Sequence, residues 1–372
     1  HIGLTIKNCK VLGGTIRATE KVGGLVGDNY GTVSGGIVCD SADEYENITK
    51  LDIILYASGE SVGGGMVGYN NANATISGGT VYGQVAVVAR SGENNASTVS
   101  VGGIVGHNNG SVSSVIAKQT KGVAIEKLKG QVGGIAGTNM GSITKAFAST
   151  EISASTENDQ VYAGGLVGKL IGDSELTVSA ARSGSVTGYY AGGLVGYVNY
   201  SKQDYRYQLS VDKNNNLKEL VGKDTISQCS VVDFSVTGKR SAGIASIIDN
   251  GIVRNCYTTA TIYGVDNNST KAGFAVDLNL NNDSVGIIIN CYASVKFNSG
   301  NGSNYAVTPK EIFKNPAFTF GVDALKRNAG YCFDFVYNKD AGGSEPDTGN
   351  VLGDLWDGWF NKDKLPAATG SQ

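Results

Sequence analysis

Apolar and polar residues alternate along most of the chain, and turns containing Gly or Asn separate the alternating stretches. Two examples are NGSVSSVIA at 109–117 and NGIVRNCYTTATIYG at 250–264. Alternation with a period of two is typical of β-strands that bury one face. Residues 1–300 contain no segment with the period of an amphipathic helix. The pattern therefore predicts an all-β protein of many short strands.

A six-residue core recurs along the chain and divides it into repeats. The core reads VGGLVG at 22–27 and AGGLVG at 163–168, and further copies stand at 63–68, 101–106, 132–137, 191–196, 241–246 and 271–276. The base period is about 30 residues, with insertions in some copies. A period of this length with two or three short strands is typical of one coil of a β-solenoid, in which stacked coils bury a continuous interior.

Each core carries an apolar residue at the same position, and stacking would place these residues in one inward column. They are Leu25, Met66, Ile104, Ile135, Leu166 and Leu194. The paired glycines before them would permit a close backbone approach or an abrupt corner. We therefore expect a parallel β-helix (β-solenoid) of about eight coils, with strands about 4.8 Å apart.

The core and the module after it together resemble the GLUG repeat. The pairing reads [VA]GG[LI]VGxN, followed by GxIxN[SC]YA as in VGIIINCYASVKF at 285–297. That repeat occurs in bacterial surface proteins, among them adhesin-like proteins and the non-catalytic repeat region of the IgA-specific metalloprotease family. The resemblance covers about residues 1–300, and it implies a right-handed β-helix on a cell-wall-associated or secreted protein.

The composition suggests two segments and three insertions. The solenoid would occupy 1–300, with insertions near 40–61, 88–100 and 199–224. Residues 301–372 differ in character and contain both tryptophans. Because an open solenoid end is an exposed sheet edge, we expect this segment to form a C-terminal cap and tail.

Charge and composition argue against several partners. The chain has 54 glycines, 4 prolines and a net charge of −3, and its Lys and Arg residues are scattered. A nucleic-acid-binding surface needs clustered basic residues, so no nucleic acid is expected. No apolar run reaches the roughly 18 residues of a membrane span, so no membrane insertion is expected within this chain.

The residues that carry catalysis are scarce. The chain has two histidines, and His107 occupies a core-flanking position that we interpret as a variable surface turn. No HExxH or CxxC motif is present, and Asp and Glu cluster in insertions and in the tail. We therefore expect no catalytic site, cofactor or metal, although a carboxylate pair brought together by the fold stays open. The Asn/Asp-rich segments 211–216 and 276–284 are interpreted as turns, with calcium ligation as the alternative.

The six cysteines suggest stacking more than cross-linking. Cys9, Cys256 and Cys291 occupy the same position of the repeat, and Cys229 lies close to it. Equivalent positions stack in a solenoid, and a buried free cysteine behaves as a small apolar residue. We expect an apolar cysteine column, with a disulfide among these residues as the alternative.

Tyrosines crowd the region around the third insertion and give the candidate ligand-binding residues. They are Tyr189, Tyr190, Tyr197, Tyr200, Tyr205 and Tyr207. Tyrosine-rich surfaces suit protein or glycan recognition, whereas packing along the coils is the alternative interpretation.

These observations together favour a non-catalytic adhesin or stalk region at a bacterial cell surface or wall. Its partner would be a protein or glycan of a host or neighbouring cell. A substrate-recognition or spacer region of a secreted metalloprotease and a polysaccharide-active β-helix enzyme are the alternatives.

Overall fold

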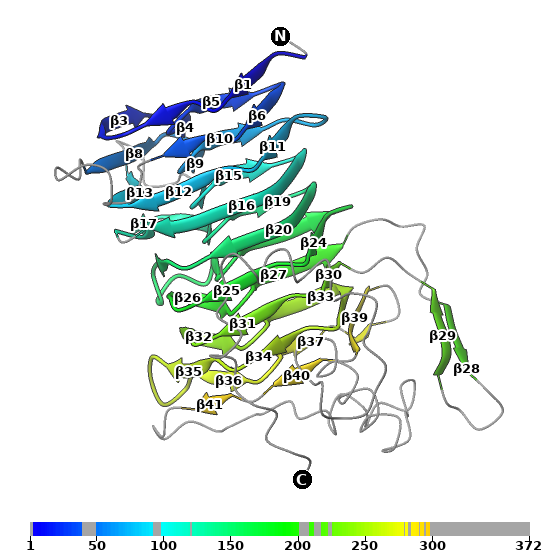
Figure 1. The fold of residues 1–372 in the computed structure, drawn as a ribbon. Helices are drawn as coiled ribbons and strands as arrows, with labels where there is room; N and C mark the ends of the chain where they lie inside the picture. The colour runs from blue at the N-terminus through cyan, green and yellow to red at the C-terminus, as the bar shows by residue number, and fades with distance from the viewer. Residues whose placement is uncertain are drawn as a thin grey trace.

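The computed structural model describes residues 3–38, 50–91, 98–119, 121–200, 208–211, 217–221, 225–278, 280–281, 284–289, 291–293 and 295–297. The described residues form strands and turns and contain no helix, which confirms the all-β prediction. Figure 1 shows the strands as successive tiers from the N-terminal end towards β41. Each tier is one coil, and each coil contributes strands to three parallel sheets, named A, B and C here.

Sheet C contains one strand from each coil. Its strands pair in parallel in the order β5 (Val26–Asn29), β10 (Val67–Asn70), β15 (Val105–Asn108), β19 (Ala136–Asn139), β23 (Val167–Gly172), β27 (Val195–Tyr200), β33 (Ala245–Arg254) and β37 (Ala275–Leu278). These eight strands confirm the expected parallel β-solenoid of about eight coils.

Sheet B precedes sheet C in each coil and has two parallel rows that merge in β26 (Ser185–Gly192) and β32 (Ser235–Ala242). The first row also contains β3 (Gly14–Ala18), β8 (Leu51–Ala57), β13 (Val85–Ser91), β17 (Val123–Glu126), β21 (Glu151–Ser153), β35 (Thr261–Gly264) and β41 (Lys296–Phe297). The second row also contains β4 (Lys21–Gly23), β9 (Glu60–Gly64), β14 (Thr98–Gly102), β18 (Lys129–Gly133), β22 (Val161–Gly164) and β36 (Thr270–Ala272).

Sheet A follows sheet C and also has two rows, which share β16 (Ser111–Gln119) and β20 (Ser142–Ala148). One row adds β1 (Thr5–Lys7), β6 (Thr32–Ser34), β11 (Thr75–Ser77), β24 (Glu175–Thr177), β30 (Ile226–Ser227), the end of β33 and β39 (Ser284–Ile289). The other adds β2 (Lys10–Val11), β7 (Ile37–Val38), β12 (Thr80–Gly83), β25 (Ala180–Arg182), β31 (Ser230–Val232), β34 (Tyr257–Thr258) and β40 (Tyr292–Ala293).

The predicted inward column is confirmed. Met66, Ile104, Ile135, Leu166 and Leu194 are fully buried, and Leu25 of the first coil is partly buried against the same core. Their backbones bond from coil to coil, for example Ile104 N to Ile135 O at 3.0 Å. Burial of such aliphatic side chains contributes roughly 1.5–3 kcal/mol each, so the column is a main source of stability.

The glycine pair of each core permits the close backbone approach that the repeat predicts. A Cβ atom on the second glycine would collide with the carbonyl oxygen of the equivalent glycine in the next coil. A Cβ on Gly103 would meet the oxygen of Gly134, and one on Gly165 would meet that of Gly193. Since these contacts involve backbone on both sides, no rotamer change can relieve them. Glycine is therefore a steric requirement of coil stacking at this position.

Left-handed residues form a second column, at the bend between the two rows of sheet A. The positions are Asn8, Gly35, Gly78, Ser114, Lys145, Val178, Gln228 and Asn255, with φ between 49° and 62°. Asn and Gly tolerate this conformation, whereas a β-branched residue such as Val178 adopts it rarely. The bend is thus imposed by the coil geometry even where the local residue disfavours it.

A ladder of buried asparagines runs through the first half of the solenoid. The Nδ2 atom of Asn29 donates to Asn70 Oδ1 at 2.7 Å, Asn70 to Asn108 at 2.8 Å, and Asn108 to Asn139 at 2.7 Å. Asn108 Oδ1 also accepts from the backbone N–H of Gly110 at 3.2 Å. Leu170 takes the same position in the next coil, so the polar ladder gives way to an apolar column there.

The cysteine column is confirmed in the last coils. Cys229 and Cys256 are buried, Cys291 is partly buried, and the three occupy equivalent positions in successive coils. The backbone N–H of Cys256 donates to Cys291 Sγ at 3.4 Å. Burial raises the pKa of the Cys256 thiol well above its ordinary value. Cys9 is exposed on the first coil, and Cys39 and Cys332 lie outside the described residues.

Strands occupy part of each segment that we expected to be an insertion. Residues 51–57 of the first segment form β8, and the ends of the second lie in β13 and β14, so the described residues of both belong largely to sheet B. In the third, β28 (Gln208–Val211) and β29 (Leu217–Val221) form an antiparallel hairpin, which Figure 1 shows beside the stack. A short strand β38 (Leu280–Asn281) pairs antiparallel with β39. The expected cap at 301–372 lies outside the described residues.

Substitution of Gly165 by Ala is predicted to destabilise the solenoid strongly. The new methyl group meets the Gly193 carbonyl oxygen, and overpacking against backbone costs at least about 2 kcal/mol. Gly27→Ala is the matched control, because its Cβ would lie 3.3 Å from the nearest atom. Urea denaturation followed by circular dichroism measures both. Equal midpoints for the two variants would contradict the steric account.

Substitution of Lys145 by Gly is predicted to stabilise the protein by about 0.5–1 kcal/mol. Lys145 has a φ of 52°, and glycine adopts this conformation without the cost that an L-residue incurs. Lys129→Gly, within strand β18, should instead destabilise by a similar amount. Thermal melting of the two variants beside the parent tests the opposite signs.

Candidate functional site

The corner between sheets B and C brings outward side chains of the two sheets into contact. In each coil the residue before the six-residue core lies on sheet B, and the residue after the core lies on sheet C. Lys21 pairs with Asp28, Gln131 contacts Thr138 and Lys169 contacts Tyr162 across this corner. Because outward-pointing residues touch one another, the corner is concave on its outer side. We call this surface the B–C corner.

In the coils from Gly68 to Gly196, the glycine that ends the core makes this concave shape possible. A Cβ atom on Gly168 would meet the backbone of Val132, and one on Gly196 would meet the backbone of Ala163. The outer faces of the two sheets therefore approach each other backbone to backbone beneath the side chains. Flanking side chains extend above this contact and are held apart by the coil spacing of about 4.8 Å.

The N-terminal part of the B–C corner contains one ion pair and one aromatic stack. Lys21 Nζ pairs with Asp28 and lies 4.9 Å from the Tyr69 ring centre. Tyr69 stacks on His107, with ring centres 4.7 Å apart and an interplanar angle of 9°. In the same region Ser100 Oγ donates to Thr138 Oγ1 of the next coil at 2.9 Å.

Tyrosines dominate the C-terminal part of the B–C corner. Tyr162 and Tyr190, on successive coils of sheet B, stack with ring centres 5.1 Å apart. Tyr197 of sheet C meets Tyr162 at 5.2 Å, and Tyr189 meets Tyr190 edge to face at 4.9 Å. All four side chains are partly buried. We call these four residues the tyrosine cluster.

Lys169 extends into the tyrosine cluster. Its Nζ atom lies 5.4 Å from the Tyr162 ring centre and 5.0 Å from that of Tyr197. Partial burial lowers the pKa of the Lys169 ammonium below its ordinary value, and burial raises the pKa of Tyr162. A cation held over two rings gains on the order of 1 kcal/mol per contact, which offsets part of its lost hydration.

Polar groups border the tyrosine cluster. The Tyr197 hydroxyl donates to Asp249 Oδ2 at 2.5 Å and accepts from Asn199 Nδ2 at 3.1 Å. Burial, and secondarily the Asp249 bond, raise the pKa of Tyr197 to about 12. Asp249 thus holds the ring in place through one carboxylate oxygen, and its charge also acts on the nearby Lys169.

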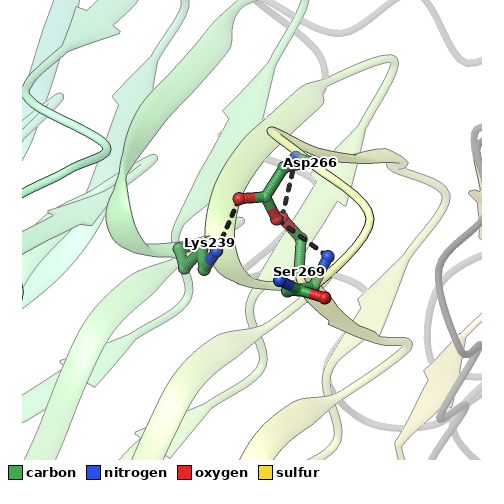
Figure 2. Close-up of polar contacts among 4 residues, drawn as sticks. Lys239, Asp266 and Ser269 are labelled. Carbon is green, nitrogen blue, oxygen red and sulfur yellow. Dashed lines mark hydrogen bonds and ion pairs between the residues drawn. The ribbon is translucent and has the colours of Figure 1, made fainter.

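Two further cations adjoin the cluster, and each has a carboxylate partner. Arg240, whose guanidinium lies 5.9 Å from the Tyr190 ring centre, pairs with Asp277. Lys239 pairs with Asp266 in the turn between β35 and β36. Figure 2 shows that Asp266 also accepts from Ser269 Oγ, at 2.9 Å, which fixes the carboxylate towards Lys239.

The structure brings three of the six candidate tyrosines together. Tyr189, Tyr190 and Tyr197 belong to the tyrosine cluster, whereas Tyr200 is buried and its hydroxyl donates to Asp173 at 2.6 Å. Tyr200 therefore packs and is unavailable to a ligand. Tyr205 and Tyr207 lie outside the described residues.

Sequence reasoning missed Tyr162, Lys169 and Arg240. Each flanks a copy of the core, as in Tyr162-AGGLVG-Lys169 and Tyr190-AGGLVG-Tyr197. Comparison of the flanking residues across all the copies would have found them, because positions seven residues apart meet at this corner.

His107 was misassigned to a surface turn. It lies in strand β15, partly buried against Tyr69, and its Nε2 atom has no hydrogen-bond partner. Burial lowers the pKa of His107 to about 4. The imidazole is therefore neutral and acts as a flat stacking partner near neutral pH.

The described residues were compared with two further requirements, those of a metal site and those of a membrane-spanning helix. No group of three His, Cys, Asp or Glu side chains there is placed to hold a metal ion. Within the same ranges, no helix is long and apolar enough to cross a membrane.

Comparisons with known proteins add no relative. No protein family, no curated protein and no solved structure matches the chain.

We predict that acid weakens the fold through His107. The folded pKa of about 4 lies below the ordinary 6.5, so the unfolded chain takes up the proton first as the pH falls. The contribution of neutral His107 to the free energy of unfolding is complete above pH 6.5. It is lost between pH 6.5 and 4, and the loss is at most about 3 kcal/mol. His107→Tyr, which extends the Tyr69 stack, should show a shallower loss of stability over this window. Parallel curves for parent and variant in urea denaturation across pH 4–7 would refute the assignment.

Proposed function

We propose that the chain is a non-catalytic binding and presentation module of an extracellular or cell-surface protein. The observation that carries this proposal is the tyrosine cluster, which consecutive coils hold on the outside of a parallel β-solenoid. The partner would be a protein or a glycan of a host or neighbouring cell.

The rigidity of the tyrosine cluster supports a recognition role. Tyrosine offers a large amphipathic surface with few rotatable bonds, so little conformational entropy is lost on binding. Here the rings are further ordered by stacking on one another and by the Tyr197–Asp249 bond. Such preorganisation lowers the free-energy cost of association.

The surroundings of the described histidine favour a passive module over a hydrolase. A Ser-His-Asp or Cys-His mechanism needs an imidazole that accepts and returns a proton. His107 instead stacks on Tyr69, and its Nε2 atom bonds to no nucleophile.

The repeat supports placement at the cell surface. The cores resemble the GLUG repeat of bacterial surface proteins, and the stacked coils form an elongated body that could hold a binding surface away from its attachment point. The proposed location is the cell surface or wall, with adhesion or presentation as the role.

The double variant Tyr190→Ala/Tyr197→Ala tests the proposal. We expect it to lose at least about tenfold in affinity for any ligand that the parent protein captures, because tyrosine anchors commonly contribute about 2 kcal/mol. The measurement is a screen of glycan arrays and extracellular-matrix proteins, followed by titration of each hit.

Tyr82→Ala is the matched control. Tyr82 lies on sheet A, and Lys118 covers its ring at 5.4 Å, so the pair reproduces the chemistry of the tyrosine cluster at another face. The control should bind as the parent does. Ligands that bind the parent and the double variant equally would refute this surface, and a screen without any ligand would refute the binding role.

A further inference from the structure

Lys169 differs from the other cations of the B–C corner. Lys21 and Arg240 each pair with a carboxylate, namely Asp28 and Asp277. The ammonium of Lys169 lies instead over the rings of Tyr162 and Tyr197, and no ion pair involving it occurs in the described part of the chain.

This arrangement leaves a partly desolvated positive charge available to a ligand. The rings of Tyr162 and Tyr197 attract the ammonium through their quadrupoles but do not neutralise it. An incoming anion would meet a cation that has already lost part of its water, so the added cost of desolvation is small. Charge-assisted hydrogen bonds of this kind are about twice as strong as neutral ones.

The groups around Lys169 favour hydroxyl-bearing ligands. Asp249, bonded to Tyr197, can accept from further donors, and Asn199 offers an amide beside it. Sugar hydroxyls donate and accept, so they suit both groups. An acidic peptide such as poly-glutamate offers carboxylates but no hydroxyl groups for Asp249 and Asn199.

The geometry of the tyrosine cluster also suits a chain-like ligand. Tyr162 and Tyr190 repeat along the stacking direction at the coil spacing of about 4.8 Å. This repeat is comparable with the advance of one sugar ring in an extended glycan chain. Because the two rings stack face to face, such a chain would meet their edges more than their faces.

We infer that the B–C corner binds an acidic glycan, with a sugar carboxylate paired to Lys169 and neighbouring hydroxyls bonded to Asp249 and Asn199. This inference rests on the proposed binding function and names its ligand class.

Titration of the whole chain with polygalacturonate, a neutral dextran and poly-glutamate tests the inference. Polygalacturonate should bind, and Lys169→Met should weaken it at least tenfold, because the variant keeps an aliphatic stem between the rings and removes the charge. Lys169→Arg should restore binding to within about threefold. Lys118→Met, which removes the cation over Tyr82, is the matched control and should bind as the parent does. Circular dichroism checks that each variant is folded.

The other outcomes separate this inference from the proposed function. Equal binding of dextran and polygalacturonate, unchanged by Lys169→Met but lost in Tyr190→Ala/Tyr197→Ala, would overturn the acidic ligand and keep the binding role. Tighter Lys169-dependent binding of poly-glutamate would overturn the glycan in favour of an acidic peptide. Polygalacturonate binding that neither the Lys169 nor the tyrosine variants affect would overturn both assignments to this surface.

Discussion

Coil stacking in this protein depends on one steric constraint at the Gly-Gly corner. The second glycine of each core lies so close to its copy in the next coil that even a methyl group cannot be placed between the two backbones. The same contact aligns the coils in register, because a shift by one residue towards the C-terminal side of the core would bring its apolar residue into the contact. Register in a sheet decides which side chains enter the core, so the glycine contact also determines the contents of every column.

The side chains of a column can be polar or apolar, provided that the polar ones find hydrogen-bond partners. The second position after the core changes from Asn139 to Leu170 while the strands stay paired in register. The asparagines form one continuous chain of hydrogen bonds between their side-chain amides, whereas Leu170 and Val198 pack as aliphatic residues. Each asparagine also bonds nearby backbone groups, as Asn139 does with Gly141, so the ladder can end where Leu170 begins.

The repeat made the architecture predictable, but it did not predict the geometry of the bends. Met66, Ile104 and Leu194 could be assigned to one inward column because their cores are nearly identical, and the cysteine column followed from the same logic. Lys145 and Val178 adopt left-handed conformations that neither residue prefers, so local propensity could not indicate the bend at those coils. The strand β8 was read as insertion because the core begins six residues after β8 ends, and nothing in its own sequence marks it as part of sheet B. His107 was read as a turn for a related reason, since the residues at its position vary from copy to copy.

That variability is the physical reason for placing recognition at the B–C corner. Positions inside the cores are constrained by packing on both sides, whereas the flanking positions only have to fit their neighbours across the corner. The register that the glycines impose brings these flanking residues into a regular array, and the array can hold an ion pair at Lys21, a stack at His107 or a cation between rings at Lys169. A rigid backbone with freely varied outer residues separates the demands of folding from those of binding. The tyrosine cluster is where this freedom has produced a surface that combines rigidity, an unpaired charge and hydrogen-bonding groups.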